Sequence, residues 1–174
     1  MTSAALARNA SRLLTEHGLS FVFPLDVKML AKKMYVKIRE AELGEGVTSV
    51  VIKERGNAHI FTHSTDTLLR QRFAIASGIG HLYLDHIPDG QHVIVDKGYH
   101  VARPGMLARD GIPQSTIDAT QFAFHLLLPQ SEIKKKMADR KDGILYDQDV
   151  AAIAKELLVS ELILTARLIM LNIL

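Results

Sequence analysis

The sequence predicts an α+β fold in which a small, mostly antiparallel sheet packs against a central helix, with further helices around them. Three observations support this fold class. Apolar residues recur at helical spacing near both ends of the chain, two short alternating runs precede residue 65, and a long apolar helical pattern follows. A chain of 174 residues can bury the core of one domain, so we expect a single domain over residues 1–174.

The first part of the chain is expected to supply two helices and most of the sheet. Gly18 stands where the first helix would end, and Pro24 is tolerated in the first turn of the second. The strand candidates alternate and are rich in β-branched residues. The predicted elements are helices over residues 3–17 and from Pro24 to Met34, a strand at YVKI (35–38), and a hairpin of VTSVVIK (47–53) and AHIFTH (58–63).

The second part is expected to be mainly helical. Capping residues mark the helix starts, and glycine and proline mark the ends. The predicted elements are a central helix capped by Thr65 or Asp66 and stopped by Pro88, Asp89 and Gly90, a short strand at QHVIVD (91–96), an irregular loop over 97–114, a helix over 116–128 capped by Ser115, further helix toward Gly143, and a C-terminal helix pair at about 147–172 with Ser160 as a cap.

Composition and charge exclude several classes of function. Lys and Arg number 21 and Asp and Glu number 19, so the formal charge of +2 provides no strong basic field for nucleic acid. The chain has no cysteine, so a metal would need histidine and carboxylate ligands. The N-terminus lacks the apolar core of a secretion signal, and the apolar C-terminal stretch is too short to cross a bilayer. We therefore expect a cytoplasmic protein with no membrane partner.

The stretch RFAIASGIGHLYLDH, residues 72–86, has the pattern of an apolar helix with one histidine turned inward. Zinc hydrolase helices of the HExxH type place two histidines at i and i+4, because that spacing puts both imidazoles on one side, a turn apart. A glutamate after the first histidine polarises the bound water. Here His81 occupies the second histidine position, whereas Ser77 and Gly78 stand where the first ligand and the base would be.

The segments RQRFAIASGIGHLYLDH and DATQFAFHLLLP occur in an informative order. The first resembles the "RFxxAHExGHxxxH" helix of the ImmA/IrrE family of zinc metallopeptidases, with His-Glu replaced by Ser77-Gly78. The second is similar to the family's "EANxFAxxLLMP" helix, in which the acidic residue supplies the third zinc ligand. Asp118 stands at that position, and Thr120 and Leu128 depart from the pattern. Flanking segments also resemble the family, so the resemblance covers nearly the whole chain and implies a zincin-like fold.

The departures from the motif predict a degenerate site. Neutral serine is a poor zinc ligand, and glycine has no side chain with which to deprotonate water. We therefore expect no catalytic residue and no cofactor, with His81 and Asp118 as vestigial zinc ligands. The hypothesis is a catalytically inactive regulatory module whose partner site or pocket includes Ser77, Gly78, His81 and Asp118. The resemblance implies a protein partner, such as a helix-turn-helix repressor of a mobile element, phage or toxin–antitoxin system.

Two catalytic alternatives remain open from the sequence. In a rearranged zinc site, His81, His86 and Asp118 would be the ligands, but His86 follows His81 by five residues and points elsewhere unless the helix ends first. Ser77 could be a nucleophile with His81 as its base at the i,i+4 spacing, although no acidic residue is evident to orient the base.

Structural roles account for the same residues without chemistry. His81 is interpreted as a core histidine that is hydrogen-bonded to a backbone carbonyl or to Asp118. Asp118 also has the S-x-x-D spacing of a helix cap with Ser115. We expect Arg72 to pair with an acidic neighbour, and His125, two turns beyond Asp118, to face solvent or the core.

The C-terminal helix pair has some features of a helix-turn-helix. Its second helix would offer mainly Glu161, Thr165 and Arg167 for reading DNA. Leu158 occupies the turn position where glycine is usual. We favour an antiparallel pair that closes the core, without direct contact to nucleic acid.

Overall fold

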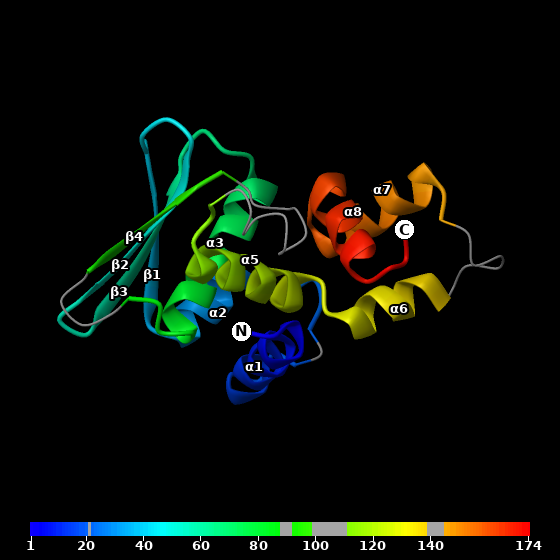
Figure 1. The fold of residues 1–174 in the computed structure, drawn as a ribbon, viewed down its shortest axis with the longest axis horizontal. Helices are drawn as coiled ribbons and strands as arrows, with labels where there is room; N and C mark the ends of the chain where they lie inside the picture. Colours follow the sequence, from blue (N-terminus) through cyan, green and yellow to red (C-terminus); the bar gives the residue numbers. More distant parts are fainter. Residues whose placement is uncertain (21, 88–91, 99–110, 139–144) are drawn as a thin grey trace.

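The computed structural model describes residues 1–20, 22–87, 92–98, 111–138 and 145–174. The helices and strands follow one another as shown in Figure 1. They are α1 (Ser3–Glu16), α2 (Val27–Lys33), β1 (Val36–Ala41), β2 (Val47–Glu54), β3 (Asn57–His63), α3 (Leu68–Tyr83), β4 (Val93–Lys97), α5 (Gln114–Leu127), α6 (Gln130–Ala138), α7 (Asp147–Leu157) and α8 (Glu161–Met170).

The four described strands form one sheet in the order β1-β3-β2-β4. Strands β2 and β3 form the predicted antiparallel hairpin, and Arg55 and Gly56 at its tip have φ values of 48° and 79°. Two successive positive φ angles suit a tight hairpin turn whose twist matches that of the strands. Strand β1 pairs with β3 in parallel, whereas β4 pairs with β2 in the antiparallel direction. The prediction of a small, mostly antiparallel sheet is confirmed.

Helix α3 lies between the sheet and α5, and α1 packs on α5 (Figure 1). This position explains why α3 is apolar around nearly its whole circumference. A Cβ atom at Gly80 would lie 3.0 Å from the backbone oxygen of Ala119 on α5. Glycine therefore allows the two motif helices to approach closely.

The starts of the two motif helices differ from the prediction. The cap of α3 is Thr67, whose hydroxyl accepts from the Arg70 N–H, and not Thr65 or Asp66. Helix α5 begins two residues earlier than expected, after Pro113 and without a side-chain cap. Ser115 therefore lies inside the helix, and its predicted capping role is wrong. The cap predicted at Ser160 is confirmed, because its hydroxyl accepts from the Ile163 N–H.

Several predictions fall on parts of the chain outside the described residues. These are the helix stop at 88–90, most of the irregular segment over 97–114, and the helix end near Gly143. In the described ranges, no helix has both the length and the apolar character needed to cross a membrane.

The C-terminal helices α7 and α8 pack against each other through a turn in which Leu158 has a φ of 52°. Helix α8 buries Leu164 and Leu168 in the core. Arg167 is its only basic residue and is 2% exposed, so its guanidinium is not presented on the surface of α8. The buried apolar face instead supports the expected role of the pair in closing the core.

Candidate functional site

The motif residues of α3 lie inside the molecule. His81 is fully buried, and Ser77 one turn before it is 6% exposed. Ser77 lines a cavity of only about 10 Å³ together with Asp96 on β4 and Thr116 on α5. That volume is close to the minimum for a single water molecule. Neighbouring side chains therefore fill the space at the position of the first ligand.

The position of the general base is closed by the sheet. A Cβ atom at Gly78 would lie 2.9 Å from both Cδ1 and Cγ2 of Ile60. Ile60 belongs to β3, in the interior of the sheet, and is fully buried. Real Cβ atoms are essentially never found so near another carbon. Even the first carbon of a glutamate side chain at residue 78 would thus require Ile60 to move.

The imidazole of His81 faces two different partners. Its Nδ1 lies 3.2 Å from Nδ1 of His86, and its Nε2 lies 3.3 Å from Oδ1 of Asp96. The second contact brings the groups close, but its direction is too poor for a hydrogen bond, so Nε2 lacks a well-aligned acceptor. The carboxylate favours a proton on Nε2. We therefore assign the His81–His86 bond with His86 Nδ1–H as donor.

His86 reaches His81 because the helix ends between them. Helix α3 stops at Tyr83, Asp85 takes a left-handed conformation with φ of 52°, and the His86 N–H donates to the His81 carbonyl oxygen at 3.0 Å. This is the condition that the sequence left open for His86, in which the helix ends before that residue. Burial, followed by the nearby His81, lowers the pKa of His86, which favours its neutral form.

Asp96 is the site residue that sequence reasoning missed. It lies near the end of β4, is 5% exposed, and accepts hydrogen bonds from Ser49 Oγ at 3.3 Å and Thr116 Oγ1 at 3.4 Å. The strand prediction at 91–96 placed a carboxylate at the end of an apolar run. Only the pairing of β4 with β2 brings that carboxylate beneath α3 and His81.

Asp118 makes different contacts from those predicted. Its Oδ2 lies 2.6 Å from the amino group of Met1, and its Oδ1 accepts from Gln114 Nε2 at 2.8 Å. The expected cap with Ser115 is absent. The predicted partner of His81, a backbone carbonyl or Asp118, is also corrected, because the His81 ring nitrogens face Asp96 and His86.

Two further predictions concern Arg72 and His125. Nε and Nη2 of Arg72 are buried and have no hydrogen-bond partner in the described residues, so the expected pairing with an acid is not observed there. Burial lowers the pKa of Arg72, and Asp26 opposes this shift through its charge. His125 contacts Arg167 and Ser3 and makes no described contact with the motif residues.

These donors do not match the ligand set of a catalytic zinc site, which usually has three protein ligands and an open position. In the described ranges, no group of three or more His, Cys, Asp or Glu side chains is placed to share a metal ion. The His81 nitrogens face two other side chains, and both oxygens of Asp118 are engaged. The small cavity beside Ser77 leaves little space for a further ligand.

A known protein-family model matches most of the chain. The family model for the IrrE N-terminal-like domain, Peptidase_M78, matches residues 31–168, a range that contains the sheet and both motif helices. No curated protein matches the chain significantly. The observed α+β architecture agrees with the zincin-like fold that the sequence resemblance implies. The chain therefore belongs to the Peptidase_M78 family of IrrE N-terminal-like domains.

Proposed function

We propose that this chain is a catalytically inactive member of its family that acts as a protein-binding regulatory module. The observation that carries the proposal is the contact of Ile60 with Gly78, where a Cβ atom would come within 2.9 Å of two Ile60 carbons. A peptidase of this type needs a base to activate water. Here the base is absent, and its space is occupied by a core side chain.

The first-ligand position supports the same proposal. Ser77 supplies only a neutral hydroxyl, which binds zinc poorly compared with imidazole. The geometry also argues against Ser77 as a nucleophile, because both ring nitrogens of its proposed base, His81, face other residues. Ser77 therefore supplies neither a strong zinc ligand nor a nucleophile with a base aligned to it.

A proteolysis assay tests the loss of activity. The 174-residue chain is incubated with fluorescently labelled casein in the presence of added Zn²⁺, beside the matched variant His81→Ala. We expect the two proteins to release fluorescence at the same background rate. Cleavage by the wild-type chain that disappears in His81→Ala would overturn the proposal.

The burial of Ser77, His81 and Asp118 argues against the partner site expected at the motif and favours a contact elsewhere on the surface. Strand β4 is an edge of the described sheet, and Val93 and Val95 are 46% and 48% exposed on it. An exposed edge can accept an extended segment as an additional strand. We propose this edge as the contact for a protein in the cytoplasm. The sequence resemblance suggests a helix-turn-helix repressor as that protein.

Copurification from the native cell tests the proposed partner. Mass spectrometry is expected to identify a helix-turn-helix regulator with the wild-type chain and to find much less of it with Val95→Lys, because lysine discourages strand pairing at an edge. Leu162→Lys is the matched control, since Leu162 is 63% exposed on α8. Equal recovery with all three proteins, or recovery of no regulator, would contradict this part of the proposal.

An active zinc peptidase with a rearranged site is the second candidate. One observation favours it, because Nδ1 of His81 and Nδ1 of His86 lie 3.2 Å apart and could approach one ion. Asp118 would be the third ligand, after release of its contacts with Met1 and Gln114. Zinc-dependent cleavage that is lost in His86→Ala would favour this candidate over an inactive module.

A further inference from the structure

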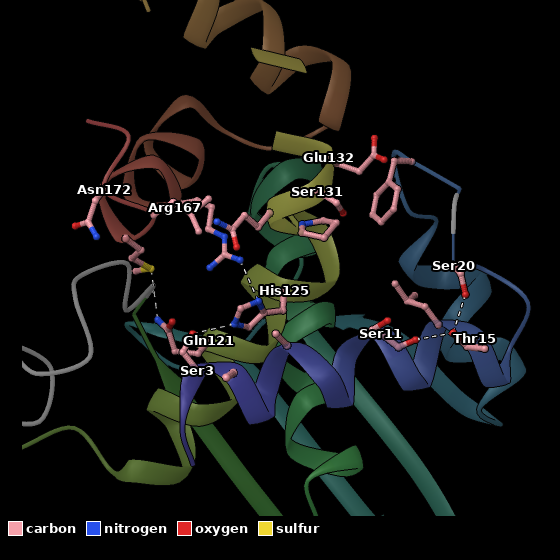
Figure 2. Close-up of a pocket in the computed structure, with 18 residues that line it drawn as sticks. Ser3, Ser11, Thr15, Ser20, Gln121, His125, Ser131, Glu132, Arg167 and Asn172 are labelled. Carbon is pink, nitrogen blue, oxygen red and sulfur yellow. Dashed lines mark hydrogen bonds between the residues drawn. The ribbon is translucent and has the colours of Figure 1, made fainter. Parts of the chain in front are cut away.

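A second cavity lies among α1, α5, α6 and α8, and its lining includes none of Ser77, Gly78, His81 and Asp118 (Figure 2). Its volume is about 970 Å³, near the upper end of the range typical of small-molecule sites. Apolar residues share its lining with hydroxyl and amide groups and with the carboxylate of Glu132. This combination suits a ligand with an apolar body and a polar end.

Arg167 places a buried positive charge in the wall of this cavity. It is 2% exposed, and its Nε–H donates to the Leu128 carbonyl oxygen at 3.0 Å, at the C-terminal end of α5. Its Nη2 donates to Nδ1 of His125 at 3.0 Å. Nη1 has no hydrogen-bond partner among the described residues, and no Asp or Glu there forms an ion pair with the guanidinium.

His125 does not supply the missing negative charge. Because its Nδ1 accepts from Arg167, its proton lies on Nε2, which is 3.2 Å from Ser3 Oγ (Figure 2). Burial and the charge of Arg167 lower the pKa of His125 to about 4, so the imidazole is neutral near pH 7. The carbonyl end of α5 offers only a partial charge. A buried guanidinium that faces only neutral groups and a partial charge lowers the stability of the fold unless an anion binds beside it.

We propose that this cavity binds a small organic carboxylate. Its anionic end pairs with Arg167, whose fork of N–H groups matches a carboxylate. Its apolar body lies along Leu14, Phe23 and Leu171, which also line the cavity. The site is independent of the proposed loss of peptidase activity, because it uses none of the motif residues on α3.

Calorimetric titration with octanoate at pH 7.5 tests the proposal, with octanol as the uncharged probe and octyl phosphate as a different anion. We expect saturable binding of octanoate and at least tenfold weaker binding of the other two. Arg167→Met should weaken octanoate binding by roughly tenfold or more, in line with the loss of a charged hydrogen bond. Arg8→Met is the matched control, because Arg8 is exposed on α1 and does not line the cavity.

A second variant tests the cavity without altering Arg167. Ala7 lines the cavity from α1, so Ala7→Phe should fill part of it and abolish octanoate binding while the chain remains folded. Ala7→Phe therefore still tests binding in the cavity if Arg167→Met does not fold. The proposal would be overturned by no octanoate binding, by equal binding of octanol or octyl phosphate, or by unchanged binding in Ala7→Phe.

Discussion

Ile60 and Gly78 meet where the central sheet packs on α3. Glycine in a helix interior normally lowers stability by about 1 kcal/mol relative to alanine, so its presence at residue 78 needs a packing reason. The reason is the Ile60 side chain, whose Cδ1 and Cγ2 approach the place of the missing Cβ. Glycine at residue 78 therefore lacks a side chain that could act as a base, and it also leaves space for the Ile60 side chain.

Gly78→Ala should lower the free energy of unfolding by about 1 kcal/mol, because overpacking exceeds the gain in helix propensity. In an Ile60→Ala background the crowding is removed, and the same change should raise stability by up to about 1 kcal/mol. Urea unfolding of the four proteins measures both effects. A change of the same sign and size in the two backgrounds would contradict the packing explanation.

His125 should make stability depend on pH. Its pKa is about 4 in the folded chain and near 6.5 when unfolded, so the unfolded state binds more protons between these values. Stability is thus fully present above pH 6.5 and is lost as the pH falls toward 4. We expect the free energy of unfolding to be about 2 kcal/mol lower at pH 5 than at pH 7.5.

His125→Gln provides the control for this pH effect, because its amide oxygen can still accept from Arg167 without titrating. Its loss of stability between pH 7.5 and pH 5 should be smaller by about 2 kcal/mol, apart from the contributions of other groups. His86 acts in the same direction, since its pKa is also lowered. An equal loss in wild type and His125→Gln would contradict the assignment to His125.

Much of the site followed from sequence, because Ser77, Gly78 and His81 are positions in one helix whose spacing is fixed. Asp96 did not follow from the sequence, and the return of His86 toward His81 was only one of two possibilities. The first depends on the register of β4 against β2, and the second on a left-handed residue that ends α3. Neither long-range pairing nor that helix end has a local pattern strong enough to predict it.

Helices α3 and α5 cross at Gly80. A Cβ atom there would meet the backbone of Ala119 at 3.0–3.1 Å, and a backbone cannot move aside as a side chain can. Gly80→Ala should therefore lower the free energy of unfolding by about 2 kcal/mol, as expected for overpacking. Gly44→Ala, whose Cβ would have only an ordinary contact at 3.8 Å, should change it by less than about 0.5 kcal/mol. Equal changes in the free energy of unfolding for the two variants, measured in urea, would contradict the close approach of α3 and α5 at Gly80.

The types and order of the described helices and strands were largely predictable, because 3.6-residue and two-residue periodicities are local. Helix caps were less so. Thr65, Asp66 and Thr67 are all plausible caps by residue type, and Thr67 is the one whose hydroxyl accepts from the Arg70 N–H. At α5, Pro113 precedes the first turn, so the helix begins before Ser115 can cap it.

Across the whole molecule, α5 links two regions with different properties. Asp118 near its start belongs to the motif region, which is closely packed around Ser77 and Gly78. His125 near its end belongs to the wall of the large cavity. The fold of the family is thus retained in a chain where the space beside the motif is filled and a separate cavity is open.

Zinc stoichiometry tests the central claim most directly. The 174-residue chain and the His81→Ala variant are each equilibrated with micromolar Zn²⁺ and freed of loosely bound metal by gel filtration. The zinc content per chain is then measured by elemental mass spectrometry. The packing around Ser77 and Gly78 predicts far less than one zinc per chain in both proteins. One zinc per wild-type chain, absent from His81→Ala, would contradict the account.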